Sequence, residues 1–182
     1  GEIPAYWYEK KTKFLFRQSS LPVRKSDEIV TAYRDGEVTL RNNRRTEGYT
    51  VAILEQGYQG IRQGQLVINS MDAFAGAIGV SDSDGKCSPE YVICDPINPN
   101  EVNPNYFALL LRQMAFAGYI EIICPAVRQR ALRFRFRNLS ELKLPVPPIL
   151  EQQRIAKFVD EIERSFKPLE KNISIEVEKL RE

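Results

Sequence analysis

Arginine and amide side chains are concentrated in three stretches of this 182-residue sequence, RNNRRTEGYT, GYQGIRQG and the arginine-rich run around LRFRFR. The planar fork of arginine suits phosphate oxygens and guanine edges, and asparagine or glutamine pairs with adenine edges. We therefore predict contacts to duplex DNA, with solvated or locally paired turns as the alternative. The candidate residues are Arg41, Asn42, Asn43, Arg44, Arg45, Gln59, Arg62, Gln63, Arg128, Gln129, Arg130 and Arg133.

Other kinds of site find little support in the sequence. The chain has no histidine, which excludes a Ser-His-Asp triad, a histidine base and the commonest metal ligand sets. Cys87, Cys94 and Cys124 are odd in number and widely spaced, so neither a disulfide framework nor a zinc site is expected. Asp82 and Asp84 lack the remaining ligands of a calcium loop, which favours a polar turn. We predict no catalytic residue, no metal and no cofactor bound by this chain.

The segment Asn103-Pro104-Asn105-Tyr106 is similar to the Asn/Asp-Pro-Pro-aromatic loop of amino-methyltransferases. An asparagine cap with proline at the first helical position is equally typical of a helix start, and a helical apolar pattern follows at once. No glycine-rich cofactor loop accompanies it. A self-sufficient methyltransferase is therefore not favoured.

The distribution of apolar residues predicts an α+β fold that is mostly β. Short apolar runs separated by turn residues between Tyr6 and Val102 indicate strands, including one that begins at Thr50. A helix is predicted from Pro104 to about Gly118. After it, Leu132, Phe134 and Phe136 alternate with arginines, which is typical of a strand with one buried face.

The C-terminal part follows a different pattern after Pro145, Pro147 and Pro148. Prolines end strands and push the preceding residue toward extended geometry, so we place a domain at 1–146 and a helical segment at 147–182. Apolar residues then recur at spacings of 4, 3, 4, 3 and 4, the seam of a coiled-coil-type helix that Pro168 should kink or restart. A plain helix folded back on the domain is the alternative. The predicted interface residues are Ile155, Val159, Ile162, Phe166, Leu169 and Ile173.

Composition adds a cellular setting to these expectations. The residues are 43% apolar and 27% charged, and no run approaches the ~20 apolar residues of a membrane span. No secretory signal is recognisable at the start. A cytoplasmic protein with no membrane partner is expected.

Several long stretches resemble one protein family. The junction LPVPPILEQQRIAKFVDEI is similar to the boundary between a target recognition domain and the conserved helical region in specificity subunits of type I restriction-modification enzymes. The runs IVTAYRDGEVTLRNNRRTEGY, YQGIRQGQLVI and MDAFAGAIGVSDSDGKCSPEYVICDP resemble a recurrent recognition domain of that family. The resemblance covers nearly the whole chain.

The resemblance implies a non-catalytic, sequence-specific DNA-binding subunit that reads one half of a bipartite site. Its implied partners are double-stranded DNA, methyltransferase subunits that carry S-adenosylmethionine, and motor-nuclease subunits that use ATP. Family members typically have two recognition domains, so this chain is expected to be a fragment or a half-subunit that pairs with a second recognition domain or a second copy through its C-terminal helix. The alternative from another class is a protein-interaction module with a dimerisation helix, whose arginines bind an acidic partner.

Overall fold

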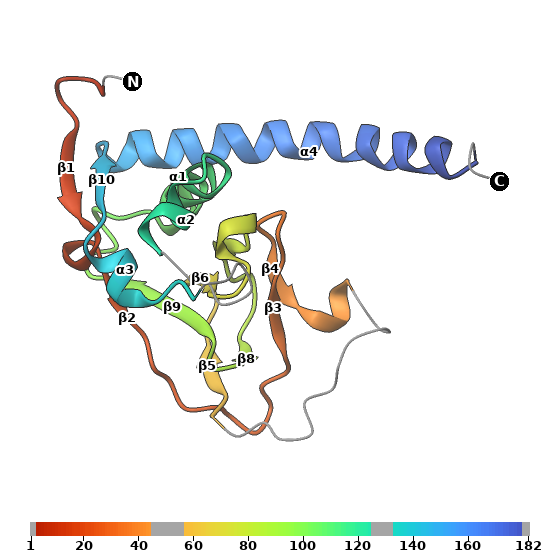
Figure 1. Cartoon of the computed structure of the whole chain (residues 1–182), viewed down its shortest axis with the longest axis horizontal. Coiled ribbons are helices and arrows are strands. Elements are labelled where there is room, and N and C mark those ends of the chain that lie inside the picture. Colours follow the sequence, from red (N-terminus) through yellow and green to blue (C-terminus); the bar gives the residue numbers. More distant parts are fainter. Residues whose placement is uncertain (1–2, 45–56, 125–132, 180–182) are drawn as a thin grey trace.

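The computed structural model describes residues 3–44, 57–124 and 133–179, with side chains described up to residue 166 (Figure 1). The fold is α+β, as predicted. The strands are β1 Tyr8–Lys11, β2 Phe16–Gln18, β3 Val30–Ala32, β4 Val38–Leu40, β5 Gln59–Ile61, β6 Leu66–Asn69, β7 Ile78–Val80, β8 Gly85–Cys87, β9 Tyr91–Pro96 and β10 Lys143–Val146. The helices are α1 Pro104–Phe116, α2 Tyr119–Ile123, α3 Phe136–Ser140 and α4 Ile149–Lys179, with 3₁₀ turns η1 Thr12–Phe14, η2 Arg41–Asn43 and η3 Ala73–Ala75. The predicted strand beginning at Thr50 lies outside the described residues.

A four-stranded antiparallel sheet of order β2-β9-β6-β7 forms the centre of the domain. Leu66, Val67 and Ile68 of β6 are all fully buried, so this strand is covered on both faces. Leu66 and Ile68 belong to the larger core, together with α1. Val67 and Ile93 belong to a second, smaller core that includes residues of the β3–β4 and β5–β8 pairs. The sheet thus lies between the core that contains α1 and the core that contains the β3–β4 and β5–β8 pairs.

The helix predicted after Val102 is confirmed as α1. The Asn103 side chain accepts a hydrogen bond from the backbone N–H of Asn105 at 2.9 Å, which caps the first turn. Phe107 and Leu111 point into the larger core and are fully buried. Gly118 has a φ of +75° just beyond the helix, a conformation that glycine adopts without steric cost.

The β3–β4 pair is held against β7 by a close backbone contact. A Cβ atom on Gly79 would collide with the carbonyl oxygen of Gly36 and would lie 2.8 Å from a methyl group of Val38. Val38 also forms a parallel bridge with Ser81, next to the end of β7. This contact fixes the position of η2, which follows β4 directly.

The strand predicted at LRFRFR is wrong for the part that the structure describes. Residues 133–135 have no strand assignment, and α3 begins at Phe136. The Asn138 side chain accepts from the backbone N–H of Arg135 at 3.0 Å and so starts a helical turn where alternation predicted extended chain. Phe134 is nevertheless buried, and its backbone N–H and carbonyl oxygen bond to the carbonyl and the hydroxyl of Ser70 at 3.1 and 2.7 Å.

Helix α4 begins directly after Pro147 and Pro148, runs along α1 and extends away from the rest of the chain at its C-terminal end (Figure 1). It continues through Pro168, so of the two predicted effects of this residue the restart does not occur, and the kink stays a prediction. Ile155 packs on the larger core, whereas Ile162 and Phe166 are 39% and 55% exposed. The side chains of Leu169 and Ile173 lie outside the described residues. Among the described helices, none is long and apolar enough to cross a membrane.

Candidate nucleic-acid interface

The described candidate residues on the β-rich part lie mainly on segments that are tied together by backbone hydrogen bonds. The Gly64 N–H donates to Ser81 O at 2.8 Å, which joins the turn after β5 to the turn after β7. The Asp82 N–H donates to Val38 O at 3.0 Å, which joins the second turn to β4 and thereby to η2. These polar turns are adjacent, although they come from separate parts of the sequence.

The three residues of η2 differ in how strongly the domain holds them. Arg41 is half-buried, and its Nε donates to Thr31 Oγ1 at 3.4 Å. The Asn43 amide donates to Thr39 Oγ1 at 2.7 Å, which leaves its carbonyl oxygen as an acceptor for a ligand. Asn42 is exposed. Asn43 is exposed as well, so both amides of this turn are accessible to solvent, and the Asn43 amide is held by β4.

Arg44, directly after η2, is held by two acids and an aromatic ring. Its Nη1 donates to Asp35 Oδ2 at 2.7 Å and to Glu37 Oε2 at 2.9 Å, and its guanidinium carbon lies 4.1 Å from the centre of the Tyr33 ring. The charge of Arg44 is thus already balanced within the hairpin. A phosphate or guanine that binds this side chain has to replace the carboxylates as its hydrogen-bond acceptors.

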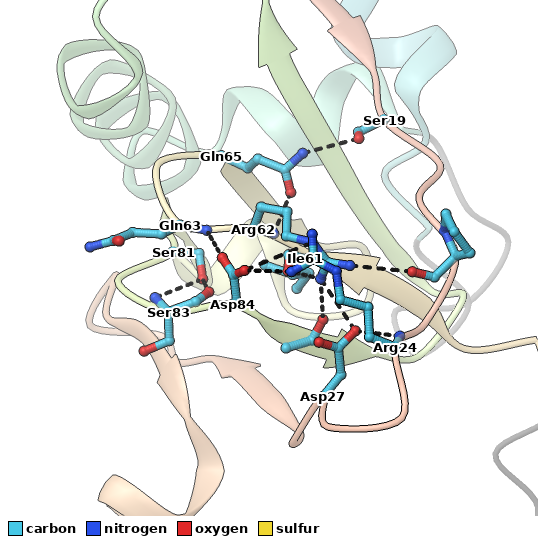
Figure 2. Close-up of polar contacts among 12 residues, drawn as sticks. Ser19, Arg24, Asp27, Ile61, Arg62, Gln63, Gln65, Ser81, Ser83 and Asp84 are labelled. Atoms are coloured by element: carbon cyan, nitrogen blue, oxygen red, sulfur yellow. Dashed lines mark hydrogen bonds and ion pairs between the residues drawn. The ribbon is translucent and has the colours of Figure 1, made fainter.

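Arg62 is the centre of a polar network (Figure 2). The guanidinium donates to the carbonyl oxygens of Ile61 at 2.6 Å and Gly85 at 3.3 Å and to Asp27 Oδ2 at 3.2 Å. Only 16% of the Arg62 side chain and 4% of the Asp27 side chain are exposed. This arrangement connects β5, β8 and the chain before β3, and it gives Arg62 a structural role.

The two glutamines around Arg62 point in different directions. The Gln59 amide donates to Tyr91 O at 2.8 Å and to Ser88 O at 3.2 Å, so it is turned toward the domain. Gln63 is exposed, and its side chain points away from the Arg62 network in Figure 2. Its backbone N–H donates to Asp84 Oδ1 at 3.0 Å. Gln63 thus offers its amide to solvent beside the turn at Asp84.

Asp82 and Asp84 lie in a turn where their carboxylates take part in hydrogen bonds and an ion pair. Asp84 Oδ2 lies 3.0 Å from Nη1 of Arg24, and the backbone hydrogen bond from Gln63, followed by the charges of Arg62 and Arg24, lowers the pKa of Asp84. Within residues 3–44, 57–124 and 133–179, no group of three or more possible metal ligands occurs. The expected polar turn agrees with these contacts.

The third predicted stretch is described only in part. Arg45, Arg128, Gln129 and Arg130 lie outside the described residues. Arg133 is described, and its Nε lies 3.2 Å from Glu90 Oε2, to which Arg135 also approaches at 3.6 Å. Glu90 therefore neutralises part of this arginine cluster.

Sequence reasoning identified the arginines but missed the acids that hold them. Asp35 and Glu37 are close to Arg44 in sequence, and the hairpin turn at Gly36 is a signal that could have indicated the pairing. Asp27 lies 35 residues from Arg62 and Glu90 lies far before Arg133, so no local pattern indicates these pairs. Tyr33, which stacks under Arg44, was also missed.

Comparison with known proteins places this chain in a family. A family model for the type I restriction modification DNA specificity domain matches residues 23–179, and the chain belongs to that family. A search of curated proteins found no match.

Solved structures share the fold at low sequence identity. They include the HsdS subunit from Thermoanaerobacter tengcongensis (15% identity, TM-score 0.57, 94% of this chain and 41% of that chain) and the type I restriction-modification S subunit from M. genitalium (16%, 0.57, 96% and 44%). A third, described under complex assembly and conformational transition of the type I R-M system, has 14% identity and a TM-score of 0.60, and covers 100% of this chain and 44% of that chain. The chain spans less than half the length of each of these proteins.

The Arg62 network predicts that replacing Arg62 lowers the free energy of unfolding much more than replacing Arg24, which lies nearby. Arg62→Met should lower the free energy of unfolding by about 2–4 kcal/mol, because it leaves the buried Asp27 carboxylate without its cation. Arg24→Met, which removes the exposed pair with Asp84, should cost less than about 1 kcal/mol. Urea unfolding of both variants measures the difference. Equal stabilities would contradict a structural role for Arg62.

Proposed function

We propose that this chain is the DNA-reading part of a type I restriction-modification specificity subunit and that it recognises one half of a bipartite site in duplex DNA. The observation that carries the proposal is the family match, which spans both the β-rich domain and most of α4. The exposed amides of Asn42 and Gln63, on polar turns joined through β4 and β7, supply side chains suited to base edges.

The proposed reading surface combines fixed and exchangeable side chains. Arg62 holds the turns in place, while Asn42 and Gln63 contact bases and Asn43 offers one remaining acceptor. Arg44 exchanges Asp35 and Glu37 for DNA when the duplex arrives, and the carboxylates then repel incorrectly placed phosphates. Arg41, Arg45, Arg128, Gln129, Arg130 and Arg133 are proposed to contact the backbone or base edges around this centre.

Catalysis belongs, in this proposal, to partner subunits. Methyltransferase subunits bring S-adenosylmethionine, motor-nuclease subunits bring ATP hydrolysis, and this chain binds neither cofactor. The lack of histidine in the sequence and the burial of all three cysteines support a chain without a histidine general base or a reactive cysteine of its own. The exposed part of α4 is proposed to dock these subunits and a second recognition domain, either on the same longer chain or on a second copy.

Salt dependence of DNA binding tests the proposal against an acidic protein partner. The logarithm of the affinity should fall linearly with the logarithm of salt concentration, with a slope of about −3.6 for four neutralised phosphates. Fluorescence anisotropy with a duplex selected from a random library measures this slope. If no duplex is enriched and none binds at low salt, the protein-interaction alternative replaces DNA reading.

Base reading by η2 predicts an effect confined to part of the site. Asn42→Ala should cost about 1–3 kcal/mol on the selected duplex and relax the preference at one or two base pairs, with little effect on a random duplex. Asn100→Ala, an exposed asparagine before α1, is the matched control. Selection and titration of both variants measure specificity. An equal loss on selected and random DNA would assign Asn42 to the phosphate backbone instead.

If copies of the chain associate through the apolar face of α4, a charge introduced on that face should dissociate the oligomer. Ile162 and Phe166 are exposed on a helix whose sequence continues the same apolar spacing, and such a stripe is rarely left in water. Ile162→Asp should convert a self-associated species at tens of micromolar into monomer, as measured by sedimentation equilibrium. Gln153→Asp adds the same charge at another exposed position of α4 and should leave the association intact. A parent chain that is already monomeric would contradict pairing of copies through this face.

A further inference from the structure

The first turns of α4 contain one fully buried polar side chain, Gln152. Its Oε1 accepts from the backbone N–H of Asn103 at 2.9 Å. Its Nε2 donates to the carbonyl oxygens of Glu101 at 2.9 Å and Pro147 at 2.8 Å. One amide therefore joins α4 to the loop before α1, to the N-cap residue of α1 and to the proline segment.

The partners of Gln152 require an amide of this length. The site presents one backbone donor and two backbone acceptors, and a primary amide supplies an acceptor oxygen and two N–H donors. A glutamate has no donor when ionised, and a methionine of similar size has neither an N–H nor a strong acceptor. Either substitution leaves buried backbone groups without partners, which costs free energy at each group.

Aromatic side chains also hold the junction between the proline segment and the start of α4, which we call the joint. The Tyr106 hydroxyl donates to Pro145 O at 3.2 Å, and burial, followed by the charge of Glu151, raises the pKa of Tyr106 to about 12, so it remains a donor at neutral pH. Glu151 accepts from the Trp7 indole at 3.2 Å and from the Tyr6 hydroxyl at 3.1 Å. The residue that precedes Gln152 is thus tied to the chain that leads into β1, which itself pairs with β10.

A second contact lies farther along α4. Arg112 of α1 reaches Glu163 at 3.4 Å, and the Arg112 guanidinium occupies the space that a Cβ atom on Gly36 would need, 2.6 Å away. Arg112 therefore touches both α4 and the turn of the β3–β4 hairpin that carries η2. Helix α4 is therefore in contact with the rest of the chain at two separate positions, Gln152 and Glu163.

We propose that Gln152 is a positioning residue that sets the angle between α4 and the β-rich domain. The joint is a property of this chain alone. A fixed angle would also hold η2 in a fixed orientation relative to the partner that α4 binds. This consequence for DNA rests on the proposed function.

Pulsed electron paramagnetic resonance on the whole chain tests the proposal. Spin labels at Ser20→Cys and Glu161→Cys, both exposed positions, report the distance between the β-rich domain and α4. Cys87, Cys94 and Cys124 are buried, and burial raises the pKa of each thiol, so they compete poorly for the label. Dilution with unlabelled chain removes distances between copies.

The expected result is a single narrow distance distribution in the parent and at least a twofold broader one in Gln152→Met and Gln152→Glu. Gln153→Met, the exposed neighbour, should keep the parent width. Ile68→Val, which weakens the core without touching the joint, should lower the unfolding midpoint and keep the distribution narrow.

Unchanged widths in both Gln152 variants, or equal broadening in Ile68→Val, would overturn the positioning role. DNA is absent from this experiment, so its outcome is independent of whether the chain reads a DNA sequence.

Discussion

The burial of β6 on both faces is the constraint on which the architecture depends. Leu66 and Ile68 contribute to the core shared with α1, and Val67 contributes to the smaller core with residues of the β3–β4 and β5–β8 pairs. A strand enclosed in this way cannot slip by one residue, because the slip would exchange the residues of the two cores. The core that contains α1 and the core that contains the β3–β4 and β5–β8 pairs are therefore held on opposite faces of one layer.

Arginine has two different roles on this protein. Arg62 is nearly enclosed and connects the backbone carbonyls of Ile61 and Gly85 with the Asp27 carboxylate, whereas Arg44 lies on an aromatic ring with two carboxylates at its edge. The first arrangement is a permanent part of the fold. In the second arrangement, Asp35 and Glu37 of the same hairpin occupy the positions at Arg44 that an anionic ligand would take. Under the proposed function, such pairing lowers the affinity for nucleic acid in general and favours ligands that also satisfy the neighbouring amides.

The sequence predicted features that depend on neighbours in the chain. The start of α1 followed from Asn103 and Pro104, and several strands followed from apolar runs between turn residues. The LRFRFR strand was wrong because one side chain, Asn138, bonds to the backbone three residues earlier, a competition that alternation does not reveal. The partners of Arg62 and of Gln152 come from distant segments, so only the folded arrangement identifies them.

Because α4 is long and continuous, a small rotation at its beginning produces a large displacement at its far end. A helix of 31 residues is about 46 Å long at ~1.5 Å per residue. The arm from Gln152 to Lys179 is about 40 Å, so a rotation of about 10° at Gln152 moves the far end by roughly 7 Å, which corresponds to about two base pairs at ~3.4 Å each. The three hydrogen bonds of Gln152 thus control a displacement of the C-terminal end of α4 that is much larger than any change in their own lengths.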